Sequence, residues 1–196
     1  MVDNRLVAVA FSRTSTKKSP GLDGLGPLAI RCLYDWEADR IGAILRAHIR
    51  LGIHPEAWKT ARGATIPKPG KVDYTLAKAY RVISLLNCLG KMVEKMAAEL
   101  ISAHCEALNK FHPGQYGGRP GRSAVDAVVV AIAHMQDAWR RGNVAGALMM
   151  DVAPAFPSVA RGCLHRKMRD MKINENLVQW VDSLRRDGKV ILSIDG

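Results

Sequence analysis

A chain of 196 residues with 48% hydrophobic residues is long enough to bury one sizeable core, which excludes an intrinsically disordered protein. The formal net charge of +11 favours a polyanionic partner such as nucleic acid. About half of this charge lies between Lys59 and Lys91, where Asp73 is the only acid. The alternative is a basic but otherwise ordinary surface.

The cysteines and the apolar segments restrict the compartment. Cys32, Cys88, Cys105 and Cys163 are widely spaced and form no C-x-x-C pair, which argues against a zinc ribbon or a disulfide scaffold and suits a reducing compartment. The apolar run at residues 6–11 is too short for a secretory signal, and no window approaches the ~18 apolar residues of a membrane span. We therefore expect an intracellular protein, nuclear or cytoplasmic, that is not secreted and has no membrane partner.

The first third of the chain predicts a tail followed by a long helix. Residues 1–18 are expected to form a flexible basic tail, and the P-G-L-D-G cluster at 20–24 predicts a turn. Apolar residues recur at helical spacing from 27 to 51, with a proline in the first turn. Gly52 is expected to cap this helix at its C-terminus.

The middle of the chain predicts a hairpin and two helices. Residues 63–67 and 80–86 are strand candidates joined by a long basic connection. An amphipathic helix is expected at 89–108. After a glycine-rich interruption, Ser123 is expected to cap a second helix that runs to about Arg141.

The last third predicts a buried strand followed by two helices and a strand. Residues 144–152 form a continuous apolar run that ends in Asp151, as expected of a buried strand. Helices are expected near 160–171 and 174–186, and a strand at 189–194. The expected fold class is α/β (α+β), helix-rich with a small sheet.

Three sequence clusters carry the chemical signal. The first, within residues 66–87, consists of I-P-K-P-G-K followed by Y-R-V-I-S-L-L-N. The second is Q-Y-G-G-R-P-G-R-S at 115–123, and the third is L-M-M-D-V-A-P-A-F at 148–156. In this order they resemble the fingers and the start of the palm of a reverse transcriptase of the non-LTR (LINE-like) retrotransposon type. The turn at 20–24 is similar to a further motif of that family. The resemblance covers roughly residues 19–196.

The resemblance implies a partial right-hand polymerase, with fingers at about 19–143 and the start of the palm at about 144–196. For the intact family it implies nucleotidyl transfer by two metal ions, with Mg²⁺ as cofactor and an RNA template, a DNA primer and dNTPs as partners. The rest of the palm, with two more catalytic carboxylates, is expected to follow where this sequence stops. The oligomeric state stays open.

Asp151 is the candidate catalytic residue. A carboxylate at the end of a buried strand is rigid, and its burial without a cation is costly. The resemblance makes Asp151 a ligand of both Mg²⁺ ions and the Val152 carbonyl a ligand of one. It places the Ala155 backbone at the incoming triphosphate and Phe156 under the deoxyribose, where an aromatic ring excludes a 2′-hydroxyl. The alternative is that Asp151 only ends the strand and caps the next segment.

The segment around Phe156 departs from the family pattern D-V-K-G-A-F-D. Pro154 stands where glycine is usual, and Pro157 replaces the aspartate. Because proline has no N–H, Pro154 is expected to remove one hydrogen bond to the triphosphate, a loss of ~1.5–3 kcal/mol. This substitution is typical of a decayed site.

The basic clusters supply the expected contacts to phosphates. The resemblance assigns Lys68 and Arg81 to the triphosphate of the incoming nucleotide, and Lys71 and Lys78 suit the template backbone. Arg119 and Arg122 are expected to meet nucleic-acid phosphates near a helix N-terminus. The alternative for these residues is a solvated charged loop or a glycine- and arginine-rich turn.

Three functions account for these features to different degrees. The first is a fragment of an RNA-directed DNA polymerase, inactive by itself because Asp151 is one carboxylate of three. The second is a degenerate, non-catalytic basic remnant that binds RNA or DNA by charge only. The third, an unrelated basic interaction protein, does not explain three ordered clusters.

Overall fold

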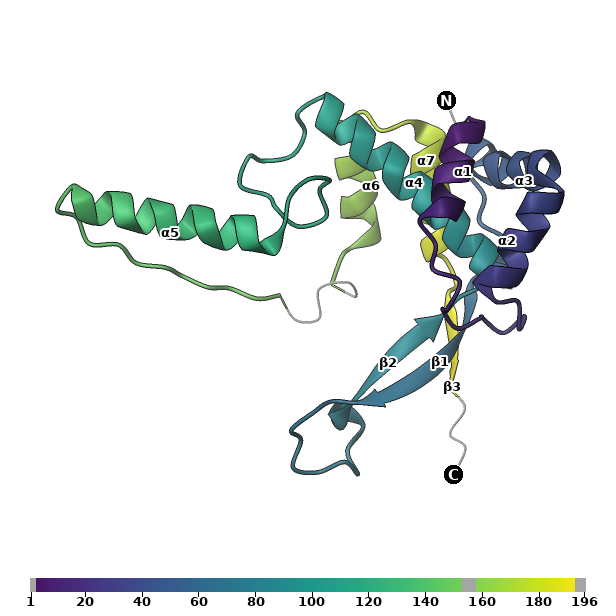
Figure 1. Cartoon of the computed structure of the whole chain (residues 1–196), viewed down its shortest axis with the longest axis horizontal. Coiled ribbons are helices and arrows are strands. Elements are labelled where there is room, and N and C mark those ends of the chain that lie inside the picture. Colours follow the sequence, from purple (N-terminus) through teal and green to yellow (C-terminus); the bar gives the residue numbers. More distant parts are fainter. Residues whose placement is uncertain (1–2, 153–157, 193–196) are drawn as a thin grey trace. The chain divides into compact units, whose positions relative to one another are not determined.

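The computed structural model describes residues 3–152 and 158–192 (Figure 1). The chain divides into two compact units, the first formed by Met1–Ile101 with Met168–Gly196 and the second by Ser102–Lys167. Among the described residues, the helices are too short or too polar to cross a membrane. The expected boundary between fingers and palm stays a prediction.

The first unit begins with a helix where the sequence predicted a flexible tail. Helix α1 spans Asn4–Ser12, and the Asp3 side chain caps it by accepting the Leu6 N–H at 2.9 Å. Val7, Ala10 and Phe11 are buried on one face of α1. The prediction of a tail was therefore wrong for these residues, because a short apolar run at helical spacing needs only a cap and a surface to pack on.

The long helix predicted at 27–51 is two helices. Helix α2 spans Pro27–Trp36 and α3 spans Ala38–Leu51, with a break at Glu37. The break lets each helix turn its own apolar residues inward, Ile30 from α2 and Leu45 from α3. The C-terminal cap is confirmed: Gly52 has a φ of 66°, the left-handed conformation that favours glycine.

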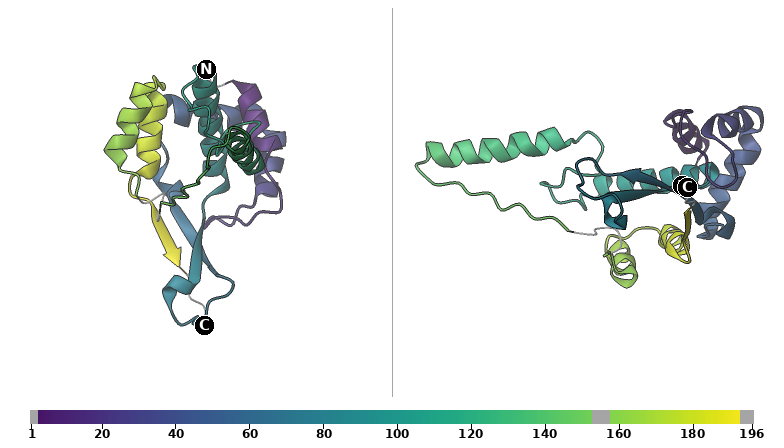
Figure 2. Two further views of the ribbon diagram at one scale, coloured as in Figure 1. Left: turned by 90° about the vertical axis from the view of Figure 1, so that its left-hand side faces the viewer. Right: turned by 90° about the horizontal axis from the view of Figure 1, so that it is seen from below.

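The sheet has three strands in the order β2-β1-β3 (Figure 2). Strand β1 spans Thr60–Pro67 and pairs antiparallel with β2 at Tyr80–Leu85, so the predicted hairpin is confirmed. Strand β3, Lys189–Leu192, pairs with the other edge of β1 in parallel. Short 3₁₀ turns at Glu56–Trp58 and Ala77–Ala79 precede β1 and β2.

Helix α4, Cys88–Ala107, confirms the predicted amphipathic helix and is fixed at its start by a turn from the N-terminal region. The Asn87 side-chain oxygen accepts the N–H groups of Leu89 at 2.9 Å and Gly90 at 3.3 Å, and the Asn87 amide donates to Asp23. The turn packs so closely that a Cβ on Gly21 would lie 2.8 Å from the Asn87 nitrogen. This contact joins the P-G-L-D-G turn to the end of β2.

The C-terminal part of the first unit packs on α3. Helix α6 spans Arg161–Asp170, across the division between the units, and α7 spans Glu175–Arg185. The Asn176 amide donates to the Arg50 carbonyl at the end of α3 at 2.8 Å. The His54 N–H donates to the Ser183 hydroxyl at 3.0 Å. The predicted helices near 160–171 and 174–186 are confirmed.

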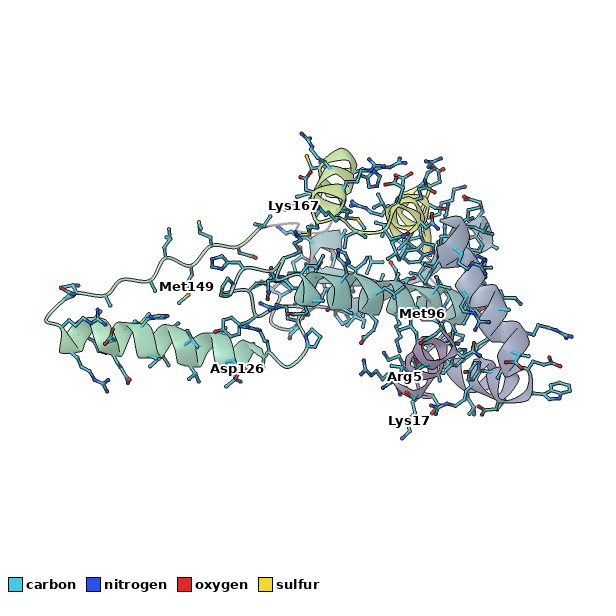
Figure 3. All side chains as sticks on the ribbon, turned by 90° about the horizontal axis from the view of Figure 1, so that it is seen from above. Arg5, Lys17, Met96, Asp126, Met149 and Lys167 are labelled. Atoms are coloured by element: carbon cyan, nitrogen blue, oxygen red, sulfur yellow. The ribbon has the colours of Figure 1, made fainter. Side chains whose placement is uncertain are left out.

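The second unit contains the end of α4, a glycine-rich loop and helix α5, Ala124–Arg140. The predicted helix is confirmed, but its apolar residues are not buried: the exposed fraction is 69% for Val125 and 58% for Val128. Residues 143–152 form no strand, so the buried strand predicted at 144–152 was wrong; Figure 3 marks Met149, which is 91% exposed. A strand needs a neighbour for its backbone groups, and none of the described strands pairs with this segment.

A buried histidine lies between aromatic rings in the first unit. The His54 ring makes edge contacts with Trp58 at 5.8 Å and Trp180 at 5.5 Å, and the residue is 1% exposed. Both ring nitrogens are buried with no hydrogen-bond partner among the described residues. Burial, helped by the nearby charges of His48 and Lys59, lowers the pKa of His54 to about 4.

The first testable consequence is a loss of stability in mild acid. The unfolded chain binds the His54 proton near pH 6.5 and the folded chain only near pH 4. The stability contributed by neutral His54 is therefore fully present above about pH 6.5. As the pH falls from there towards 4, the free energy of unfolding decreases by about 3 kcal/mol. We expect urea unfolding at pH 7 and pH 4.5 to show a smaller pH dependence for His54→Phe than for the wild type. Parallel curves would contradict the assignment.

A second testable prediction concerns the turn at residues 20–24, which fixes the start of α4. We expect Gly21→Ala to cost about 1–3 kcal/mol of unfolding free energy, because the added methyl group overlaps the backbone of residues 86 and 87. Gly146→Ala is the matched control, because nothing lies within 4 Å of the place that its Cβ would occupy and it lies in no helix or strand. Chemical denaturation checks both; equal midpoints for the two variants would rule out the close contact.

Candidate nucleic-acid and nucleotide interface

The hairpin of β1 and β2 brings Lys68 and Arg81 onto one face of the sheet. Arg81 lies opposite Ile66, and the Lys68 N–H donates to the Ala79 carbonyl at 2.8 Å, which extends the pairing. Because side chains alternate between faces, positions 66, 68, 79 and 81 share a face. Lys68 and Arg81 are therefore diagonal neighbours, with Arg81 exposed and Lys68 partly so.

The connection between the strands is ordered by its own contacts. The Lys68 ammonium donates to the Lys78 carbonyl at 2.8 Å, and the Tyr74 hydroxyl donates to the Lys68 carbonyl at 2.9 Å. Tyr74 also makes an edge contact with Tyr80 at 6.2 Å between ring centroids. Lys71 and Lys78 remain exposed on this connection, which projects beyond the sheet (Figure 1).

The charge of the hairpin is not neutralised locally. We call Lys68, Lys71, Lys78 and Arg81 the hairpin cations. The one acid of the connection, Asp73, accepts hydrogen bonds from the Thr75 hydroxyl at 2.6 Å and the Thr75 N–H at 2.8 Å, and these bonds lower the pKa of Asp73. None of the ion pairs found within residues 3–152 and 158–192 includes a hairpin cation. The hairpin therefore presents a cationic surface that can attract phosphates.

Arg119 is engaged inside its own loop. Its Nε and Nη2 donate to the two carboxylate oxygens of Glu106 at 2.7 and 2.6 Å, and Nη1 donates to the carbonyls of His112 and Gln115. The guanidinium lies 5.1 Å from the ring centroid of Phe111. The hydrogen bonds from Arg119 lower the pKa of Glu106. The side chain expected to meet phosphates is thus already paired with a carboxylate.

Arg122 differs from Arg119 because it has no carboxylate partner among the described residues. Its Nη1 donates to the Pro113 carbonyl at 3.0 Å, and the guanidinium lies 5.3 Å from the centroid of the Tyr116 ring. The residue is exposed. Its charge helps to lower the pKa of Glu106 and of Asp126, but it forms no ion pair with either, so its guanidinium can still contact an anion.

The start of α5 is closed by its own side chains. The Ser123 hydroxyl accepts the Asp126 N–H at 3.2 Å, and the Asp126 carboxylate accepts the Ser123 N–H at 2.7 Å, a capping box. The Ser123 bonds lower the pKa of Asp126, so a negative charge stands at this helix terminus. A phosphate contact of the kind predicted near this helix N-terminus can therefore form only with the loop that precedes α5.

Asp151 lies in the exposed segment 143–152. Its Oδ1 accepts the N–H of the next residue, Val152, at 2.9 Å, and both residues are exposed. The described residues contain no group of three or more His, Cys, Asp or Glu side chains placed to hold a metal ion. A two-metal centre needs several converging carboxylates, so these residues do not fit such a centre. Ala155 and Phe156, with Pro154, lie outside the described residues.

The sequence motif at 66–87 ends in Asn87, but the sequence predicted no role for Asn87 or for Glu106. Asn87 could have been found from its place before an amphipathic helix, where asparagine is a preferred N-cap. Glu106 carries no such signal, because its partner is 13 residues away across an irregular loop.

Comparison with known proteins agrees with these motifs. Residues 66–192 match the family described as reverse transcriptase (RNA-dependent DNA polymerase). The chain is 29% identical to the RNA-directed DNA polymerase from mobile element jockey of Drosophila funebris over 94% of this chain and 20% of the relative. It is 28% identical to the probable RNA-directed DNA polymerase from transposon BS of Drosophila melanogaster over 84% of this chain and 18% of the relative.

The chain spans about a fifth of the length of these curated relatives. The matched region includes the last two residues of β1, the connection, β2, the loop before α5 and the segment of Asp151. On the strength of this match, the chain belongs to the reverse transcriptase family, as its resemblance to the non-LTR type predicts.

Proposed function

We propose that this chain is the template- and nucleotide-contacting part of an RNA-directed DNA polymerase encoded by a mobile element. The observation that carries the proposal is the hairpin, whose four cations are presented without an acidic partner among the described residues. The proposed ligands are an RNA template, a DNA primer and the triphosphate of a dNTP.

Within the hairpin, Lys68 and Arg81 are proposed to hold the triphosphate. Their shared face supports this role, because a planar guanidinium and an ammonium at neighbouring positions can contact different phosphate oxygens once the Lys68 ammonium leaves the Lys78 carbonyl. Lys71 and Lys78, on the exposed connection, are proposed to contact the template backbone. Arg122, exposed and without a carboxylate partner among the described residues, is proposed as a further phosphate contact.

Asp151 is proposed to bind Mg²⁺ in the intact polymerase, with the Val152 carbonyl as a further ligand. Reverse transcriptases as a family use divalent metal ions, and oxygen ligands suit Mg²⁺. Ala155 and Phe156 keep their proposed roles at the triphosphate and the deoxyribose. The metal-dependent step requires acidic side chains beyond those that the described residues bring together.

A second candidate, binding of nucleic acid by charge without catalysis, is favoured by the exposure of Asp151. A carboxylate held by the backbone N–H of its neighbour, with no converging acids among the described residues, does not assemble a reaction centre. The two candidates share the same basic surface and differ in whether nucleotide transfer occurs.

We therefore expect salt-sensitive binding of RNA and DNA with little sequence preference. The three proposed contacts from Lys71, Lys78 and Arg122 to single-stranded RNA give a slope of about −2 for log K against log salt concentration, and roughly a fortyfold weakening between 50 and 300 mM salt. Fluorescence anisotropy with a labelled oligonucleotide measures this slope. Equal affinity at the two salt concentrations would refute the electrostatic account.

The hairpin is tested by the double variant Lys71→Gln/Lys78→Gln, which removes the two cations proposed to contact the template backbone. We expect weaker binding and a slope reduced by about 1.4, because each lost phosphate contact removes about 0.7 on a single strand. Arg40→Gln/Arg186→Gln is the matched control: it removes the same formal charge from arginines that are exposed and already paired, with Glu37 and Asp182. If the control weakens binding as much as the hairpin variant, net charge and not the hairpin is responsible.

For catalysis, we expect no primer extension by the 196-residue chain on a poly-A template with an oligo-dT primer, in Mg²⁺ or Mn²⁺. The physical reason is that Asp151 has no second carboxylate beside it among the described residues. Incorporation of labelled dTTP is the measurement, with Asp151→Ala as the reference. Template-dependent extension that disappears in Asp151→Ala would overturn the expectation.

A further inference from the structure

The loop between α4 and α5, residues 109–122, is organised around one guanidinium. The Arg119 side chain is only 10% exposed and uses its three nitrogens in four hydrogen bonds, two to Glu106 and two to loop carbonyls. Arg119 also lies over the Phe111 ring, so a charge pair and an aromatic face hold it together. A phosphate could reach this guanidinium only by displacing a bidentate carboxylate.

Other contacts of the loop lie within it, such as the bonds from Arg122 to the Pro113 carbonyl at 3.0 Å and from the Gln115 N–H to the His112 carbonyl at 2.9 Å. The loop contains no helix or strand, and its backbone turns through positive φ at Asn109, Gly118 and Gly121. The His112 and Gln115 carbonyls, both bound by Arg119, lie in the middle of the loop. The Arg119 fork therefore joins the last turn of α4, where Glu106 lies, to two points of an otherwise irregular segment.

We propose that Glu106 and Arg119 are positioning residues: their ion pair sets the shape of loop 109–122 so that the loop meets the nucleic-acid backbone, and Arg119 itself contacts no phosphate. The inference rests on the proposed nucleic-acid binding and assigns the contact to Arg122. Arg122 shares the loop but is exposed, stacked on Tyr116 and free of a carboxylate partner among the described residues. An ordered loop does not lose conformational entropy again when it binds.

The Glu106–Arg119 pair predicts a change in nucleic-acid affinity opposite to the change expected from net charge alone. Glu106→Gln removes one negative charge and releases Arg119. If Arg119 were a phosphate ligand, this variant would therefore bind nucleic acid more tightly than the wild type. A positioning pair gives the reverse: we expect binding to weaken about fivefold, because the loop must be ordered at the moment of binding. Oligonucleotide anisotropy at fixed salt measures the change.

The matched control is Asp137→Asn in the same unit. Asp137 pairs with Arg141 at 2.6 Å on exposed α5, so this variant makes the same charge change and also releases an arginine. We expect its affinity to be unchanged or slightly higher. Equal weakening in Glu106→Gln and Asp137→Asn would overturn the proposal, as would tighter binding by Glu106→Gln.

A second pair of variants separates shape from charge. Arg119→Lys keeps the charge and loses the planar fork, so we expect it to weaken binding as much as Arg119→Gln. Adding Glu106→Gln to Arg119→Gln is expected to have little further effect, because either change alone breaks the pair. Full affinity in Arg119→Lys would show that charge, not position, matters, and the proposal would fail.

Backbone amide hydrogen exchange supplies a readout that needs no ligand. We expect exchange in residues 109–122 to become faster in Glu106→Gln and Arg119→Lys while the core of the first unit, such as Val93, stays protected. Unchanged loop exchange contradicts the proposal even if binding changes. If wild-type protein shows no salt-dependent binding, the proposed function fails instead, and the exchange result still decides whether the pair orders the loop.

Discussion

Strand β1 is the constraint on which the first unit depends. On one edge, β1 pairs antiparallel with β2 and forms the basic hairpin. On the other edge, β1 pairs in parallel with β3, near the C-terminal end of the chain. The close approach of β3 requires glycine at position 63, where a Cβ would lie 2.9 Å from the Val190 side chain. The hairpin thus starts from a strand that is paired on both edges at residues 62 and 63, and the hairpin cations lie beyond this part, on β2 and on the connection.

The arginines of the site show that residue type does not reveal role. Arg81 and Arg122 are exposed and have no carboxylate partner in the described part of the chain, whereas Arg119, three residues before Arg122, is bound to Glu106 and two carbonyls. A guanidinium that is already paired offers little to a phosphate, because the new contact must replace an equally charged one. The same G-R-P-G-R motif therefore contains one arginine suited to organise the loop and one suited to contact a ligand.

The sequence predicted the features that local chemistry decides. The hairpin, α4, the Ser123 cap and the Gly52 cap each depend on residues a few positions apart, and each is confirmed. The Glu106–Arg119 pair was beyond such patterns, because it forms across an irregular loop. The break at Glu37 was missed for a related reason: tertiary packing, with no proline or glycine at the break, decides where the long helix ends.

The error at residues 144–152 bears directly on catalysis. An apolar run predicts burial only if other strands cover its backbone and side chains, and none of the described strands does so. In that setting Asp151 keeps its hydration, and no desolvation cost draws a cation to it. The carboxylate becomes a strong metal ligand only when neighbouring strands bury it together with other acids. The phosphate binding proposed for the hairpin needs no such partner, so the proposed binding and the proposed metal-dependent step place different demands on the same chain.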